Sequence, residues 1–185
     1  IPRDEFNARL LKTFEALESA VADGKIRMYG AATWNGFRNE PGAKDYLSLE
    51  ETVAVAEKAG GREHHFKVIQ LPLNLGMAEA LSLSNQEMRG KKMTTLEAAQ
   101  ALDITVMCSA SVLQGQLTRN LPGLFREAFP GLKTDAQLAL QFVRSTPGVT
   151  TALVGMKQAA HIDENLQTVK VPPASWEQYS KLFQS

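Results

Sequence analysis

Residues 26–34, with the sequence Ile-Arg-Met-Tyr-Gly-Ala-Ala-Thr-Trp, form a short run rich in apolar and small side chains. Such a run is typical of a strand buried on both faces, as strands of parallel sheets are. In the preceding segment, residues 5–22, apolar side chains recur at helical spacing, and Asp23-Gly24 supplies a stop signal. The pattern therefore predicts a helix followed directly by a buried strand.

The same alternation of helix and strand recurs along the chain. Further helices are predicted at residues 49–59, 94–102, 134–144, 158–169 and 175–183, and further strands at 67–73, 104–109 and 149–154. Thr94 or Thr95 is expected to begin one of these helices, and Thr134 or Asp135 another. The predicted strands begin roughly 40 residues apart, which is the spacing of right-handed βα units in a parallel sheet.

Four parallel strands at this spacing fit two α/β architectures. One is a small doubly wound sheet, and the other is half of a (β/α)8 TIM barrel, which needs at least ~200 residues when complete. A helix precedes the first strand, and the chain begins with Ile1 rather than Met, so we expect an element upstream. No low-complexity tract or long linker divides residues 1–185, which we interpret as a single domain.

Composition disfavours several classes of partner. The 185 residues carry 20 basic and 20 acidic side chains, and this balance disfavours nucleic acid and anionic membranes as partners. No apolar run approaches the ~18 residues that cross a bilayer. The single cysteine, Cys108, cannot form an internal disulfide, and no signal peptide opens the chain, so we expect a reducing, cytoplasmic location.

The clearest indication of a ligand follows the last predicted strand. In both architectures ligands gather at the carboxyl ends of the parallel strands. Gly155 lies between that strand and a helix, where backbone N–H groups can approach an anion. Lys157, and His161 when protonated, lie at the positive end of the helix dipole, which is unfavourable unless a negative ligand offsets it. The run favours a phosphate site, with a solvated lysine beside a turn glycine as the alternative.

Other polar or reactive residues have simple structural explanations. Gln70, in an otherwise apolar strand, either binds an amide group or hydrogen-bonds internally. Trp34 either contacts a ligand or, as we favour, covers the rim. Cys108 is expected to be a buried small hydrophobe, and His64-His65 to lie in a solvated loop rather than bind a metal. The sequence contains no Walker-type loop, GxGxxG, CxxC or GxSxG motif.

Four short segments spread over nearly the whole chain share a further property. They are residues 24–34 (GKIRMYGAATW), 70–75 (QLPLNL), 113–118 (LQGQLT) and 154–166 (VGMKQAAHIDENL). In this order they resemble the C-terminal half of the aldo-keto reductase family. The resemblance implies a (β/α)8 barrel whose fifth to eighth strands lie in this chain. It also implies NADPH-dependent reduction of aldehydes or ketones, without a metal.

The resemblance also implies how the nicotinamide end is held. The family places a Ser and an Asn after its fifth strand and a Gln on its sixth, and the matching residues are Ala32, Thr33 and Gln70. Only the Gln is retained unchanged. After the seventh strand Ser109 stands in the place of an aromatic ring, and a shift of the alignment would bring Ser111 to the neighbouring Ser position.

At the adenosine end the match is better. Residues 155–157 match the phosphate-binding turn, Glu164 and Asn165 match the adenine contacts, and His161 replaces an Arg that often grips the 2′-phosphate of NADP. This replacement leaves NAD open beside NADP, because histidine is only partly charged near neutral pH. The implied cofactor-binding residues are Thr33, Gln70, Ser109, Gln114, Gly115, Gln116, Leu117, Gly155, Met156, Lys157, His161, Glu164 and Asn165.

The family's catalytic Asp, Tyr, Lys and His lie on its first four strands, which have no counterpart here. We therefore assign no catalytic residue, and neither Tyr29 nor Tyr46 has an identifiable lysine beside it to act as a general acid. The chain is interpreted as the cofactor half of a reductase for small carbonyl substrates. A dinucleotide-binding or regulatory module without chemistry is the second hypothesis, and an unrelated four-strand domain the third. A half barrel exposes sheet edges, so we expect it to pair with the absent half or with itself.

Overall fold

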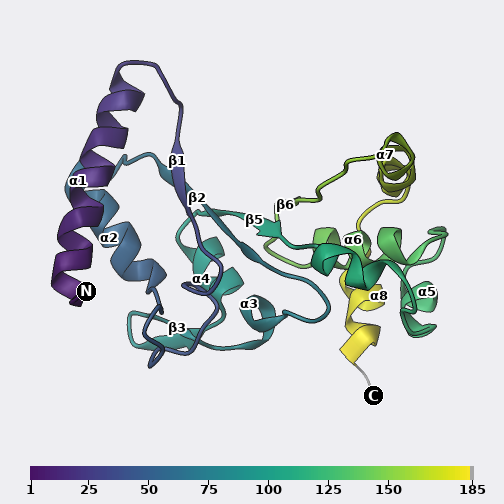
Figure 1. The fold of residues 1–185 in the computed structure, drawn as a ribbon. Coiled ribbons are helices and arrows are strands. Elements are labelled where there is room, and N and C mark those ends of the chain that lie inside the picture. Colours follow the sequence, from purple (N-terminus) through teal and green to yellow (C-terminus); the bar gives the residue numbers. More distant parts are fainter. Residues whose placement is uncertain (184–185) are drawn as a thin grey trace.

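The computed structural model describes residues 1–183 and centres on a parallel sheet (Figure 1). Its strands are β1 (Tyr29–Ala32), β2 (Phe66–Pro72), β5 (Thr105–Ser109) and β6 (Thr151–Ala152). They are hydrogen-bonded in the order β1-β2-β5-β6, and every neighbouring pair is parallel. This order confirms the predicted succession of βα units, and it leaves β1 and β6 as the two edges of the sheet.

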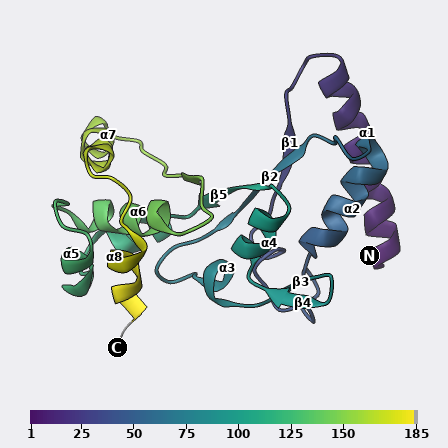
Figure 2. The same ribbon diagram turned by 180° about the vertical axis from the view of Figure 1, so that it is seen from behind.

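Helices lie beside the sheet in two groups, which both ribbon views separate clearly (Figures 1 and 2). Helices α1 (Arg3–Ala22) and α2 (Leu49–Gly60) lie side by side next to β1, and α4 (Thr95–Ala101) packs on β5. The C-terminal helices gather near β6, and α7 stands apart from them at the end of a long connection. This second group comprises α5 (Leu124–Ala128), α6 (Asp135–Ser145), α7 (Ala159–Leu166) and α8 (Trp176–Ser180).

The two faces of the sheet differ in burial. Side chains alternate along each strand, so Ile69 and Leu71 of β2 share one face and Gln70 lies on the other. Ile69 and Leu71 are fully buried, whereas Gln70 is partly exposed. On β5, Val106 and Cys108 are likewise buried under the helices. The second face is therefore open, and one row across it runs through residues 32, 70, 107 and 151 in register.

Aromatic packing holds the first helix to the sheet. The ring of Phe14 on α1 lies 5.1 Å from that of Tyr29 and 5.2 Å from that of Phe66, measured between ring centroids. Phe14 is 2% exposed and Phe66 fully buried. Aromatic side chains bury large areas and gain further from such tilted or offset contacts. The first apolar stripe of the sequence thus becomes the contact of α1 with β1 and β2.

Side-chain caps define where several helices begin. Thr94 caps α4 and Thr134 caps α6, each in a capping box with the residue three positions on. Both residues were among the predicted caps. Ser48 and Ser175 cap α2 and α8 in the same way through a backbone N–H. These caps satisfy helix N–H groups that have no partner inside the helix.

The structure differs from the predicted elements at both edge strands. Strand β1 covers four of the predicted residues, and its register against β2 shifts between Tyr29 and Gly30. Strand β6 shrinks to two residues, although Thr150 and Leu153 each donate a further backbone hydrogen bond to β5. An antiparallel hairpin, β3 (Gln86–Met88) with β4 (Lys91–Met93), and the short α3 (Glu79–Ser82) were not predicted.

His64 and His65 lie in the loop before β2, as predicted, but the expectation that both are solvated holds only for His65, whose side chain is 44% exposed. His64 is 6% exposed, and burial lowers its pKa. The ring Nδ1 of His65 lies 2.7 Å from Glu18 Oε2 on α1. His65 directly precedes β2, so its contact with Glu18 joins α1 to this end of the sheet. Within residues 1–183, no helix combines the length and the apolar character needed to cross a membrane.

Candidate functional site

A cavity of about 1010 Å³ opens beside the carboxyl ends of β5 and β6. One wall is the chain after β5, including the 3₁₀ segment η1 (Leu113–Thr118), and the opposite wall comes from the end of β6 and from α7. Ala136 of α6 lies between them. The lining residues are Ala110, Ser111, Val112, Gln114, Gly115, Gln116, Thr118, Arg119, Ala136, Leu153, Val154, Gly155, His161, Glu164 and Asn165.

The first turn of α6 fastens both walls of this cavity. Asp135 Oδ2 accepts a 3.0 Å hydrogen bond from the backbone N–H of Leu121, just beyond the first wall. Gln137 Nε2 donates a 2.8 Å hydrogen bond to the backbone oxygen of Glu164 on α7. Both side chains are at least nine-tenths buried. Hydrogen bonds between buried groups are expensive to break, so this turn fixes the distance between the walls.

The wall that follows β5 contains a concentration of left-handed backbone. Ala110, Leu113, Gln114 and Asn120 all have φ between 46° and 62°. A non-glycine residue in this region costs roughly 1–2 kcal/mol. Such residues cluster at functional sites, where the surrounding structure holds them in place. The unfavourable backbone conformations of this segment therefore favour a functional role for it.

The wall formed by α7 carries an orphaned acceptor. The side-chain oxygen Oδ1 of Asn165 is buried and has no hydrogen-bond partner within the described chain. His161 and Glu164 line the cavity from the same helix. A buried polar atom without a partner is costly unless a ligand or water satisfies it. Asn165 is therefore prepared to meet a donor from a bound molecule.

A second group of unsatisfied polar atoms lies at the ends of β1 and β2. The backbone N–H of Thr33 donates to Gln70 O at 2.9 Å, which places the two residues side by side. Thr33 Oγ1 is buried and has no partner among the described residues. The side-chain amide of Gln70 lies on the open face of the sheet, and no internal hydrogen bond to it is observed over residues 1–183. These groups can bind an amide.

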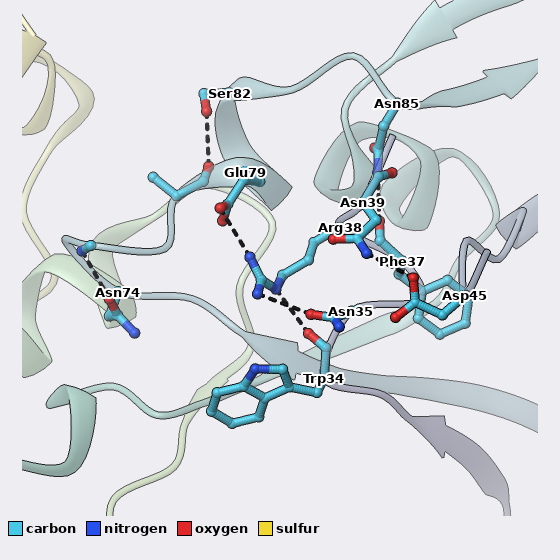
Figure 3. A network of polar contacts seen from close by, with 12 residues as sticks. Trp34, Asn35, Phe37, Arg38, Asn39, Asp45, Asn74, Glu79, Ser82 and Asn85 are labelled. Carbon is cyan, nitrogen blue, oxygen red and sulfur yellow. Dashed lines mark hydrogen bonds and ion pairs between the residues drawn. The ribbon is translucent and has the colours of Figure 1, made fainter. Parts of the chain in front are cut away.

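Figure 3 shows how the chain after β1 is held next to this group. The guanidinium of Arg38 donates to Trp34 O at 2.8 Å and to Asn35 Oδ1 at 3.1 Å, and pairs with Glu79 Oε1 at 2.9 Å. The Arg38 side chain is only 12% exposed. Trp34 itself is 52% exposed, and its covering of the rim stays a prediction (Figure 3).

The structure brings most of the predicted site residues together, in two places. Seven of them line the cavity, and Thr33 and Gln70 form the second group. Ser109 lies at the end of β5, outside the cavity lining, whereas Ser111 is part of it. Leu117, Met156 and Lys157 also lie outside the lining. Arg119 lines the cavity and was missed, although it directly follows the matching segment at residues 113–118.

Other reactive groups of the chain are engaged elsewhere. Cys108 is fully buried, as predicted, and burial raises the pKa of its thiol to about 12. The hydroxyl of Tyr29 donates to Glu18 at 2.8 Å, and that of Tyr46 donates to Asn85 O at 2.9 Å. Within the described part of the chain, no three His, Cys, Asp or Glu side chains gather in a way that could hold a metal ion.

Comparison with known proteins identifies the fold. No protein-family model and no curated protein matches the sequence. Among solved structures, a thermostable aldo-keto reductase in complex with the inhibitor epalrestat matches with a TM-score of 0.64 at 16% identity, covering 95% of this chain and 54% of its own.

An aldo-keto reductase from Klebsiella pneumoniae matches at 24% identity both in complex with NADPH (TM-score 0.62) and with NADP and acetate (0.63). Each match covers 95% of this chain and 53% of the solved chain. The chain thus spans about half the length of the structures that it matches. Its parallel sheet and helices have the fold of half an aldo-keto reductase TIM barrel, so the barrel is the correct one of the two predicted architectures.

Proposed function

We propose that this chain belongs to the aldo-keto reductase family and forms the half of the barrel that holds a nicotinamide dinucleotide. The observation that carries the proposal is the pair of orphaned polar atoms, Thr33 Oγ1 and Asn165 Oδ1, in the two groups of predicted cofactor residues. A dinucleotide is an extended ligand with an amide at one end and a base at the other. It is suited to two separate polar sites at the carboxyl ends of one sheet.

The residues fit the two ends of such a ligand. Thr33 and the free amide of Gln70 would bind the nicotinamide carboxamide, because they can offer both donors and acceptors. Asn165 and Glu164 would contact the adenine. The left-handed segment around Gln114 and Gly115 would lie over the pyrophosphate. Support comes from the Klebsiella pneumoniae reductase of similar fold, which was solved in complex with NADPH.

The role of this chain in the reaction is binding and orientation. The reduced nicotinamide, when bound, supplies hydride to a carbonyl carbon. Thr33 and Gln70 would hold the nicotinamide through its carboxamide, because they lie side by side at the ends of neighbouring strands. The Arg38 clamp holds the turn that carries Trp34, so the exposed indole lies at the end of β1 where a small carbonyl substrate would approach.

None of the tyrosine hydroxyls within residues 1–183 is free to act as a proton donor. The hydroxyl groups of Tyr29, Tyr46 and Tyr179 all take part in internal hydrogen bonds. Burial raises the pKa of each of them, which makes a phenol a poorer acid. This observation favours the second candidate function for the chain by itself, a dinucleotide-binding module without chemistry. Reduction would then require catalytic side chains on a complementary half.

The complementary half would also complete the barrel. Edges β1 and β6 are unpaired, and the row through Ala32, Gln70, Met107 and Thr151 is uncovered on the open face. Four further parallel strands between β6 and β1 would close the sheet and remove both edges. We propose such a half as the partner of this chain, with self-association as the substitute when it is absent.

Calorimetric titration with NADPH and NADH tests the cofactor site. We expect saturable binding of one or both, weakened about tenfold or more in Gln70→Ala and in Asn165→Ala, because each loses a hydrogen bond to the ligand. Gln100→Ala on the exposed side of α4 removes an amide remote from both groups and serves as the control. Absence of binding by the wild-type chain, or equal losses in all three variants, contradicts the proposal.

A further inference from the structure

Three loops at the carboxyl ends of the sheet carry the candidate site, and the middle one contacts both of its neighbours. The outer loops follow β1, next to the amide-binding group, and β5, where the chain enters the cavity wall. The middle loop follows β2, and we name its residues 74–79 the bridge segment. The contacts of this segment determine how the amide-binding group and the cavity are spaced.

Glu79 connects the bridge segment to the loop after β1. It is the first residue of α3, and its Oε1 lies 2.9 Å from the guanidinium of Arg38 (Figure 3). The same guanidinium donates to Trp34 O and to Asn35 Oδ1, so a single side chain joins the two loops. Because the Arg38 side chain is largely buried, solvent and salt screen this ion pair less than a fully exposed one.

Asn74 connects the other end of the bridge segment to the chain after β5. Its side chain is fully buried. Its Nδ2 donates to Ala110 O at 3.0 Å, and its Oδ1 accepts from Gly76 N at 2.8 Å. Ala110 lines the cavity in a left-handed conformation, with φ 56°. The amide of Asn74 therefore helps to hold that residue in a backbone conformation that is unfavourable by itself.

Packing adds a second contact between the bridge segment and the cavity wall. A Cβ built at Gly76 would lie 3.5 Å from Cδ2 of Leu113, the first residue of η1. The backbone N–H groups of Asn74 and Met77 each donate to the other residue's carbonyl oxygen, at 3.2 and 3.1 Å, which closes the segment into a tight turn. The bridge segment is thus tied to itself and to both neighbouring loops.

We propose that Asn74 and Glu79 are positioning residues, which fix the spacing between the amide-binding group and the cavity to match an extended ligand. The inference rests on the proposed dinucleotide site and says how that site keeps its two ends in one arrangement. Two linked fragments bind more tightly than separate ones in proportion to an effective concentration, which is highest when the spacing of the subsites matches the ligand. Neither side chain needs to touch the ligand for this effect.

Calorimetric titrations with whole ligands and with their halves isolate this effect. The probes are NADPH and NADH, and the mononucleotides that compose them, namely reduced nicotinamide mononucleotide, adenosine 2′,5′-bisphosphate and 5′-AMP. Glu79→Ala and Asn74→Ala should weaken dinucleotide binding at least fivefold while changing the affinity for each mononucleotide less than twofold. Glu79→Gln, which can still accept from Arg38, should keep part of the dinucleotide affinity. Glu63→Ala in the exposed loop before β2 and Asn7→Ala on α1 are the matched controls and should leave all affinities unchanged.

The outcomes separate this inference from the function beneath it. If wild type binds a dinucleotide and both alanine variants of the bridge segment bind it equally well, the positioning role is overturned and the cofactor site stands. If a variant loses affinity for one mononucleotide as much as for the dinucleotide, the residue acts at one subsite alone, and the inference also fails. If wild type binds neither dinucleotide, the proposed function fails and this inference fails with it.

Thermal melting of each variant shows whether the fold is retained. Asn74 is fully buried, so its replacement can unfold the chain, whereas the Glu79 side chain is 40% exposed and its replacement leaves the core untouched. Should Asn74→Ala fail to fold, Glu79→Ala decides the test: a selective loss of dinucleotide affinity supports the inference, and unchanged affinity overturns it.

Discussion

Glu18 is the side chain that connects α1 to the start of the sheet. Its Oε1 accepts from the Tyr29 hydroxyl at 2.8 Å and from the backbone N–H of His65 at 2.7 Å, and its Oε2 lies 2.7 Å from the His65 ring. The carboxylate is 13% exposed. Burial by itself raises the pKa of Glu18, but these hydrogen bonds outweigh it and lower the pKa below its ordinary value. The ionised form is thus the one that the fold stabilises.

Glu18→Gln tests this contact. A hydrogen bond to a charged group contributes about 1.5–3 kcal/mol, and the amide retains part of the network, so we expect a loss of about 1–2 kcal/mol at pH 7 by urea denaturation. Because the folded-state pKa is lowered, the contribution is complete above the unfolded-state pKa and disappears as the pH falls through the folded-state value. The difference between wild type and variant should therefore shrink in acid. Glu15→Gln, exposed on the same helix, should change little at either pH.

Sequence reasoning found residues whose role depends on near neighbours and missed those that depend on distant ones. The burial of Cys108 followed from the apolar strand around it. The pairing of His65 with Glu18 joins residues 47 positions apart, so it depends on how α1 packs against the sheet and cannot be predicted from local sequence. Arg119 follows a matching segment, but its neighbours in sequence do not show that it lines one cavity together with His161.

Strand β1 depends on a close approach to its neighbour. A Cβ added at Gly30 would lie 2.2 Å from the backbone oxygen of Val68 on β2, a distance that no relaxed structure tolerates. Overpacking of this kind destabilises by 1–3 kcal/mol or more, so Gly30→Ala should lose about 3 kcal/mol in denaturant titrations. Gly42→Ala is the matched control, since its added Cβ meets nothing within 4 Å. Equal stability of the two variants would contradict the close approach.

Helix α6 depends on its capping box, because the turn that it begins fastens both walls of the cavity. Thr134 Oγ1 accepts from Gln137 N at 3.3 Å, and Gln137 Oε1 accepts from Lys133 N at 2.8 Å. Loss of an N-cap costs about 1 kcal/mol, so Thr134→Ala should lower stability by that amount and Thr134→Ser should restore most of it. Hydrogen exchange of α7 amides should quicken in Thr134→Ala only. Unchanged hydrogen exchange of the α7 amides would contradict the link between the Thr134 cap and the position of α7.

The helices were easier to predict from sequence than the edge strands. Caps such as Thr94 and Thr134 and apolar positions at helical spacing are local features, so α2, α4 and α6 lie within a residue or two of their predictions. The length of β6 depends on how many of its residues pair with β5, and a local sequence pattern does not predict that number. The hairpin of β3 and β4 was missed because its short polar strands lack the apolar alternation that identifies strands.

The sheet as a whole has an open face and two unpaired edges, and these govern how the chain behaves in solution. Unpaired strand edges and exposed apolar surface promote association, and natural proteins avoid them. Met28, directly before the edge strand β1, is 50% exposed. We expect the 185-residue chain without a complementary half to self-associate in sedimentation velocity, with a weight-average mass that rises with concentration.

Two apolar-to-lysine substitutions test whether association uses the edge. Met28→Lys places a charge beside β1 and should shift the distribution toward monomer, since charged side chains protect exposed edges. Leu124→Lys on α5 changes an apolar side chain that is similarly exposed, at 41%, but distant from β1, and should have no such effect. A monomer at every concentration would contradict self-association. Equal dissociation of both variants would mean that scattered apolar surface holds the copies together, and not the open edge that a second half of the barrel would otherwise pair with.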